Sequence, residues 1–341
     1  MTSSSLTSIL VTGGAGFIGS NLIEHLLEKY PQYKIVNLDA LTYAGNPDNL
    51  KAVQDNPRYT FVKGDICDKA LLEKIFTEHD IRGVFHLAAE SHVDNSIAGP
   101  EIFFMTNVIG TQRLIHTAYR HWMNGVGDVK KGYEGARFHL TSTDEVYGTL
   151  GETGLFSETT PYAPNPPYAA SKAGGDFVVR SYNRTFGLNA TISNCSNNYG
   201  PHQHAEKLIP TIIRKALAGQ PIPIYGDGKN IRDWLYVKDH ANALDTVFHN
   251  GRSGETYNIG CDNEQDNNAM AGLICGILDE LKPQAESYSK LISYVKDRAG
   301  HDRRYAIDST KIETELGWKA QSDFMPALRS TVQWFMENRR G

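Results

Sequence analysis

The chain has 341 residues, 40% hydrophobic and 21% charged, proportions that are typical of globular proteins and exclude a fibrous or disordered chain. Its 34 basic and 39 acidic residues leave a net charge of −5, so we expect no nucleic-acid partner, and any anionic ligand must be bound locally. The apolar runs are too short to cross a bilayer and the first residues lack a signal-peptide pattern, which predicts a cytoplasmic protein without a membrane partner.

The four cysteines are scattered along the chain and form no CxxC pair. This spacing argues against a zinc knuckle and against a redox pair. We therefore expect reduced cysteines and no metal site.

The first half of the chain alternates short β-branched runs with longer amphipathic stretches. Brief apolar runs predict buried strands at residues 8–14, 34–40, 59–65, 83–89 and 137–143. Apolar positions three to four residues apart predict helices at 17–30, 68–79 and 100–122. This β-α-β series predicts the α/β class, with a Rossmann-type, doubly wound parallel sheet.

The pattern loosens after residue 187. Residues 189–197 predict one more strand, whereas 200–210, 221–234 and 261–268 are polar connections that contain Gly or Pro or several Asn and Asp. Length alone allows one large domain or two. We expect a nucleotide-binding domain over residues 1–187, to which some later segments return, and a smaller, mainly substrate-binding domain over 188–341.

A glycine-rich segment, Thr12–Gly19, follows the first predicted strand and opens the first predicted helix. Gly13 permits a tight turn, Gly16 lets the backbone approach a pyrophosphate, and Gly19 allows close helix packing. The helix N-terminus offers unpaired N–H groups and the positive end of its dipole to phosphate. Asp39 ends the second strand, where an acid binds ribose hydroxyls and repels the 2′-phosphate of NADP. The pattern therefore predicts NAD as the cofactor.

Further cofactor contacts are expected at the start of the first helix and at the ends of the third and fourth strands. The predicted cofactor-binding residues are Gly13, Gly16, Phe17, Ile18, Gly19, Asp39, Asp65, Ile66, Ala88 and Ala89, together with Tyr168 and Lys172. The alternative is a glycine turn beside a capping or surface aspartate.

Tyr168 and Lys172 lie four residues apart in a predicted helix at 167–187, so they share one face of it. A lysine beside a tyrosine stabilises the phenolate and lowers its pKa, and the positive nicotinamide ring acts in the same direction. Tyr168 is therefore a candidate base for a substrate hydroxyl. Thr143, which ends the strand at 137–143, can supply another hydroxyl. The alternative is a packed tyrosine beside a surface lysine.

The order of glycine turn, strand-end threonine and YxxxK resembles the extended short-chain dehydrogenase/reductase family. Segments along nearly the whole chain are similar to those of its dTDP-glucose 4,6-dehydratases: NLDALTYAGN, HLAAESHVDNS, TSTDEVYG, PYAASKAGGD, NNYGP, EKLIP and RAGHDRRYAID. The resemblance implies a lyase that turns dTDP-glucose into the 4-keto-6-deoxy sugar and water, with NAD reduced and reoxidised in each cycle.

Asp144 and Glu145 directly follow Thr143. A dehydratase removes the proton at C5 and expels the C6 hydroxyl, which requires a base and an acid side by side. Neighbouring carboxyls push their titrations apart, so one can stay protonated near neutral pH. The resemblance implies Asp144 as the acid and Glu145 as the base, in a catalytic set with Thr143, Tyr168 and Lys172. The alternative is a pair of solvated or helix-capping carboxylates.

The resemblance also implies a set of substrate-binding residues. They are Ser91, His92, Thr143, Asn197, Glu206, Lys207, Leu208, Arg232, Arg298 and His301. Arginines suit a diphosphate because a guanidinium binds two phosphate oxygens at once. Residues 202–205, Ala299 and residues 261–268 depart from the family pattern, and these departures concern the choice of base in the nucleotide pocket.

The helices at 100–122 and 167–187 resemble those that pair across a dimer axis in this family, which implies a homodimer joined by a four-helix bundle. Both faces could instead be covered within one chain. Three rival functions stay open: a UDP-glucose 4,6-dehydratase, a nucleotide-sugar 4-epimerase, and an NAD-sensing binding module without catalysis.

Overall fold

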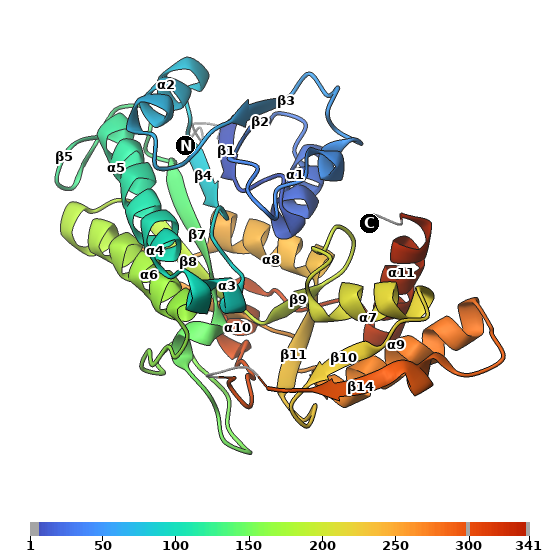
Figure 1. Ribbon diagram of the computed structural model, residues 1–341. Helices are drawn as coiled ribbons and strands as arrows, with labels where there is room; N and C mark the ends of the chain where they lie inside the picture. The colour runs from blue at the N-terminus through green and yellow to red at the C-terminus, as the bar shows by residue number, and fades with distance from the viewer. Residues whose placement is uncertain (1–6, 298–300, 339–341) are drawn as a thin grey trace.

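A computed structural model describes residues 7–297 and 301–338. Its centre is a seven-stranded sheet with the order β12-β8-β7-β4-β1-β2-β3, in which every neighbouring pair is parallel. The strands are β1 Ser8–Thr12, β2 Lys34–Asp39, β3 Tyr59–Lys63, β4 Gly83–His86, β7 Arg137–Thr143, β8 Ala190–Cys195 and β12 Thr256–Ile259. This order, with helices on both faces, confirms the predicted Rossmann-type α/β fold (Figure 1).

Helices cover both faces of this sheet. One face carries α2 (Lys69–His79), α5 (Thr111–Trp122) and α6 (Pro167–Phe186). The other carries α1 (Phe17–Lys29), α8 (Val237–Asn250) and α10 (Thr310–Leu316). Since side chains alternate along a strand, the strand residues divide between the two cores.

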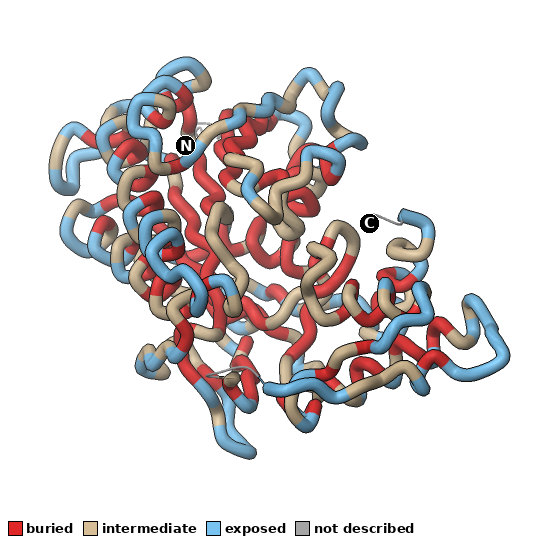
Figure 2. The backbone as a smooth tube through the Cα atoms, in the orientation of Figure 1, coloured by how far each residue is buried: buried red, intermediate tan, exposed pale blue. Residues whose placement is uncertain are grey.

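The first strand shows this division. Leu10 packs in the core under α2 and α5, whereas Ile9 and Val11 pack in the core under α1 and α8. All three side chains are fully buried. Figure 2 shows the sheet strands as a buried band inside helices whose outer turns are exposed.

The helix predicted at 100–122 has the expected extent but is not uniform. It consists of α4 (Glu101–Phe104), a π-helical segment Met105–Gly110 and α5. Within the π-helical segment, the Asn107 amide donates to the Glu90 carbonyl at 3.0 Å and to Ser171 Oγ at 2.8 Å. The wider turn therefore places an amide between two segments of the site, which hydrophobic spacing cannot reveal.

A second core lies beside the large sheet (Figure 1). It is built from α7 (Leu208–Leu217), α9 (Asn267–Leu281) and α11 (Phe324–Glu337), with the parallel strands β10 (Ile222–Tyr225) and β14 (Ile292–Val295). A three-stranded sheet runs between the two cores, in the order β13 (Glu264–Asp266), β11 (Ile231–Tyr236) and β9 (Asn197–Tyr199). The shorter elements are η1 Pro47–Leu50, α3 Val93–Ala98, β5 Met123–Gly125, β6 Asp128–Val129, η3 Asp144–Tyr147 and η4 Tyr288–Leu291.

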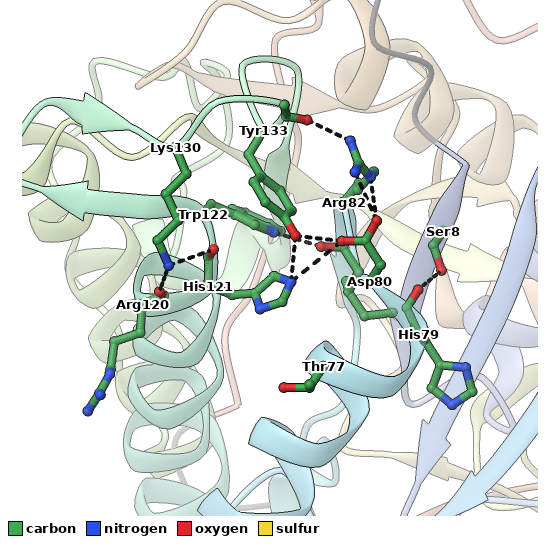
Figure 3. Close-up of polar contacts among 12 residues, drawn as sticks. Ser8, Thr77, His79, Asp80, Arg82, Arg120, His121, Trp122, Lys130 and Tyr133 are labelled. Carbon is green, nitrogen blue, oxygen red and sulfur yellow. Dashed lines mark hydrogen bonds and ion pairs between the residues drawn. The ribbon is translucent and has the colours of Figure 1, made fainter.

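The β5–β6 hairpin and the residues after it are held by a polar cluster at the end of the sheet away from the glycine turn (Figure 3). The Tyr133 hydroxyl donates to Asp80 Oδ1, and Arg82 Nε donates to Asp80 Oδ2 at 2.9 Å. Lys130 Nζ donates to the carbonyls of Arg120 and His121 at the end of α5.

Of the helices within residues 7–297 and 301–338, none combines the length and apolarity needed to cross a bilayer.

Candidate active site

The carboxyl ends of the parallel strands open into a cavity of about 410 Å³. Such strand ends are where open α/β sheets bind ligands. Every predicted cofactor-binding residue lines this cavity: Gly13, Gly16, Phe17, Ile18, Gly19, Asp39, Asp65, Ile66, Ala88, Ala89, Tyr168 and Lys172. So do all five predicted catalytic residues, which brings together segments far apart in the chain.

The glycine turn requires two of its glycines for separate reasons. Gly13 has φ +70°, and a Cβ there would lie 2.7 Å from the amide nitrogen of Ala88 on the neighbouring strand end. A Cβ at Gly19 would overlap the carbonyl oxygen of Gly13. Gly16 is the N-cap of α1 and has no capping side chain, so the first N–H groups of the helix remain available to an anion.

Asp39 ends β2 with both carboxylate oxygens fixed by the backbone. Oδ2 accepts from the Ala15 amide at 2.9 Å and Oδ1 from the Leu41 amide at 2.8 Å. Burial raises the pKa of Asp39, and these two backbone hydrogen bonds oppose that rise. Each oxygen keeps acceptor capacity for a ribose hydroxyl. The glycine turn, the open helix terminus and the ribose-side acid together fit a dinucleotide such as NAD.

Tyr168 and Lys172 occupy the first two turns of α6, whose start is set by Pro166 and Pro167. The side chain of Lys172 is buried, and its Nζ donates to the Thr141 carbonyl on β7 at 2.8 Å. Burial, together with the charge of Glu145, raises the pKa of Tyr168 well above its ordinary value. This direction is the opposite of the expected effect of Lys172. The groups that raise this pKa therefore favour the protonated form of Tyr168.

Asp144 and Glu145 begin the 3-10 turn after β7, where the Glu145 amide donates to Thr143 Oγ1 at 3.3 Å. Asp144 is 2% exposed and accepts from Thr143 Oγ1 at 3.3 Å. Burial and the neighbouring Glu145 raise the pKa of Asp144 well above its ordinary value, while Arg232 opposes this rise. The raised pKa favours the protonated form of Asp144, which is the form that a general acid requires.

The predicted substrate-binding residues divide into two groups. Ser91, Thr143, Asn197, Glu206 and Lys207 line the cavity. Lys207 Nζ donates to the Ser91 carbonyl at 3.3 Å, which joins two of the lining segments.

His92, Leu208, Arg232 and His301 do not line the cavity. His92 Nδ1 accepts from the Asn95 amide and caps α3, while its Nε2 lies 3.6 Å from the Glu206 carboxylate. Arg232 lies over the Tyr305 ring at 4.3 Å and donates to the Asp302 carbonyl. His301 pairs with Asp297 at 2.6 Å.

Leu208 is the first residue of α7. Arg298 lies outside the described residues.

The sequence matches the family described as GDP-mannose 4,6 dehydratase over residues 10–331. The chain belongs to this dehydratase family.

Among its relatives, the dTDP-glucose 4,6-dehydratase of Shigella flexneri is 52% identical over 339 residues, which cover 97% of this chain and 93% of that relative. The chain is also similar to the solved dTDP-glucose 4,6-dehydratase of Bacillus anthracis str. Ames in complex with NAD, at 45% identity and a TM-score of 0.86 over 98% and 97% of the two chains. The Streptomyces venezuelae dTDP-glucose 4,6-dehydratase with NAD and TYD bound is 45% identical, with a TM-score of 0.88 over 97% and 98%.

Sequence reasoning missed several residues that line the cavity of this dehydratase-family chain. They include Glu90, Cys195, Asn198, Gln203 and His204. Glu90 directly follows the predicted Ala88–Ala89 strand end, and His204 lies in the segment that departs from the family pattern. Burial and the nearby Asp65 raise the pKa of Glu90. Position next to a predicted residue was the available signal for Glu90, beside Ala89, and for Asn198, beside Asn197.

Proposed function

We propose that the protein converts dTDP-glucose to dTDP-4-keto-6-deoxyglucose and water, with NAD as its bound cofactor. One observation carries this proposal: the vicinal carboxyls Asp144 and Glu145 lie in the same cavity as Tyr168 and Lys172. An oxidation at C4 requires only Tyr168 and Lys172, whereas an elimination across C5 and C6 requires the two carboxyls as well. The family match and the dTDP-glucose dehydratases at about half identity support the same reaction.

The cofactor residues fit NAD, which when bound accepts the hydrogen of C4 as hydride and returns it to C6. Gly13, Gly16 and Gly19 let the backbone approach the pyrophosphate, and Asp39 binds the ribose hydroxyls. The same Asp39 carboxylate disfavours a 2′-phosphate by like charge. Asp65, Ile66, Ala88 and Ala89 are proposed to contact the adenine and pyrophosphate side.

In the first step, Tyr168 takes the proton of the C4 hydroxyl. Because the protein groups around it raise the pKa of Tyr168, its proton affinity is high and it must lose its own proton first. The ammonium of Lys172 and the positive nicotinamide favour that loss. Thr143, buried at the end of β7, is placed to hydrogen-bond the same part of the sugar.

In the second step, the 4-ketone acidifies the C5 hydrogen, Glu145 takes that proton, and Asp144 gives its proton to the departing C6 hydroxyl. The raised pKa of Asp144 keeps the donor protonated. Glu145 is less buried than Asp144, which suits the carboxyl that must start ionised. Glu145 then returns a proton to C5.

We also propose that Ser91, Asn197, Glu206 and Lys207 contact the sugar and diphosphate, since they line the cavity. Arg232, Arg298 and His301 remain proposals for the diphosphate and nucleoside. Arg232 lies over the Tyr305 ring, and its charge acts on the catalytic Asp144. The second core is proposed to form most of a nucleotide-sugar-binding domain from residue 188 onward.

The experiment is mass spectrometry of dTDP-glucose and UDP-glucose after separate incubation with the protein. We expect dTDP-glucose to lose one water, and UDP-glucose to react more slowly. If UDP-glucose reacted as fast as dTDP-glucose or faster, the assignment of dTDP-glucose as the substrate would be wrong. An unchanged mass with inverted C4 configuration would identify a 4-epimerase, and no product despite bound NAD would identify a binding module.

A further inference from the structure

A second buried carboxylate, Asp176, lies beneath the site and has no part in the reaction described above. It follows Lys172 by one turn on α6, so the two side chains share a face of the helix. Asp176 is 2% exposed. A buried carboxylate is costly unless its charge is compensated. The groups around Asp176 therefore indicate which positive charge its own charge balances.

The hydrogen bonds of Asp176 join three segments. Its Oδ2 accepts from Ser142 Oγ on β7 at 2.9 Å and from the Tyr162 hydroxyl at 2.9 Å. Ser142 directly precedes the catalytic Thr143. Among the residues that the structure describes, Oδ1 of Asp176 has no hydrogen-bond partner. Asp176 thus ties α6 to the strand end that carries Thr143 and Asp144.

Lys172 is as deeply enclosed as its neighbour. It is 6% exposed, and within the described residues its Nζ donates one hydrogen bond, to the neutral Thr141 carbonyl. Burial lowers the pKa of Lys172, and the negative charge of Asp176 one turn along α6 opposes this fall.

We propose that Asp176 is a positioning residue for the dehydration: its negative charge lies one helical turn from Lys172, and its hydrogen bonds hold the end of β7 against α6. This role rests on the proposed function, because Lys172 acts there by stabilising the Tyr168 phenolate. Asp176 itself does not line the cavity that holds the catalytic residues.

Asp176 can change its charge within a narrow pH range. Burial raises its pKa to about 6, while Lys172 and the hydrogen bonds from Ser142 and Tyr162 oppose the rise. It also borders a cavity of about 210 Å³, which is large enough to hold water molecules. The charged or titratable groups that face it or line that cavity are Lys172, Tyr162, Tyr147, Glu158, Arg180 and Glu255.

The decisive variant is Asp176→Asn, which keeps the shape and removes the charge. We expect kcat for dTDP-glucose to fall at least about tenfold with KM nearly unchanged, and the alkaline limb of the pH profile to move down by about one unit as Lys172 loses its proton sooner. Asp176→Glu keeps the negative charge, so it should retain part of the wild-type kcat and part of the wild-type position of the alkaline limb. Arg180→Gln is the matched control, since it changes a charge at the same cavity on an exposed residue, and it should leave both unchanged.

Two further measurements keep the test decisive. Tyr162→Phe removes one hydrogen bond to Asp176, so it should raise the pKa of Asp176 and move the acidic limb upward while the alkaline limb stays. The titration of Lys172, followed by nitrogen NMR and assigned with Lys172→Met, reads the same coupling without turnover. If Lys172 titrates in the Asp176→Asn protein as it does in the wild type, the inference is overturned. If the wild-type protein binds NAD but leaves dTDP-glucose intact, only the proposed function is overturned.

Discussion

Asp39, Asp144 and Asp176 have the same side chain, but their surroundings suit them to different roles. Asp39 accepts hydrogen bonds from two backbone amides, Asp144 is buried against a second carboxyl, and Asp176 follows a lysine by one helical turn. The three have similar side chains but different partners. Burial raises the pKa in each case, and the partner decides whether the charged form survives.

Asp39→Asn should weaken NAD binding and reduce the discrimination against NADP. The carboxylate accepts from Ala15 and Leu41 and is proposed to bind the ribose hydroxyls, and hydrogen bonds to a charged acceptor contribute about 1.5–3 kcal/mol. Calorimetric titration of the cofactor-stripped protein should show the loss with NAD and a smaller loss, or a gain, with NADP. Asp65→Asn, whose carboxylate accepts from the Cys67 amide, is the control that should change the NAD to NADP ratio less.

Asp144→Asn should remove the proton donor while leaving oxidation at C4 possible. Because the pKa of Asp144 is raised, its protonated form persists to higher pH than that of an ordinary aspartic acid, and its contribution is lost as the pH rises through that raised pKa. We expect kcat to fall by about 10²–10⁴, with reduced cofactor accumulating during a single turnover. Stopped-flow absorbance of the reduced nicotinamide measures this directly, and a variant with unchanged turnover would assign the acid elsewhere.

At the scale of helices and strands, the hydrophobic pattern predicted much of the fold. The strands that alternate with helices in the first half were predicted because each is a short apolar run closed by a turn residue. β12 was not predicted, because the run Thr256–Ile259 is brief and its pairing with β8 joins residues far apart in the chain. The ligand contact of Arg232 stays a prediction, whereas its stacking on Tyr305, more than seventy residues away in the chain, is a contact that no local spacing encodes.

The contact between α1 and α8 depends on one buried charge. Asp245 is fully buried and accepts from His25, Lys29 and the Tyr30 hydroxyl on or beside α1, and from His249 on its own helix. Burial would raise the pKa of Asp245, but these hydrogen bonds lower it well below its ordinary value. A lowered folded-state pKa stabilises the protein above the unfolded-state value of about 3.9.

Asp245→Asn should therefore lower the free energy of unfolding by about 3–5 kcal/mol at pH 7. The difference from the wild type should shrink as the pH falls below about 4, where the carboxyl of the unfolded chain becomes protonated. Urea denaturation at several pH values measures both effects. Arg252→Gln, which breaks an exposed pair with Glu315, should change stability by no more than about 1 kcal/mol.

For the whole molecule, the predicted homodimer remains a proposal that the surface supports. Ile102, Phe104, Met105 and Ile109 on α4 and the π-helical segment, with Phe177 on α6, are large apolar side chains that stay exposed. Exposed apolar residues gathered on neighbouring helices are typical of an interface. These are the helices expected to form the four-helix bundle. The cytoplasmic location likewise stays a prediction.

Phe104→Asp should dissociate such a dimer, because a charge in the centre of an apolar interface is left without compensation. Sedimentation velocity should show the wild type at twice the mass of the variant. Met325→Asp on α11, another exposed apolar position, should leave the mass unchanged. Equal masses for the wild type and Phe104→Asp would place the interface elsewhere or show a monomer.

The central claim is that the hydrogen removed from C4 returns to C6 of the same sugar after Asp144 and Glu145 have eliminated water. Incubation of dTDP-glucose labelled with deuterium at C4, followed by mass spectrometry and NMR of the product, follows that hydrogen. The account predicts a product lighter by one water with the deuterium on the C6 methyl group. A product of unchanged mass with the deuterium still on C4 would contradict it.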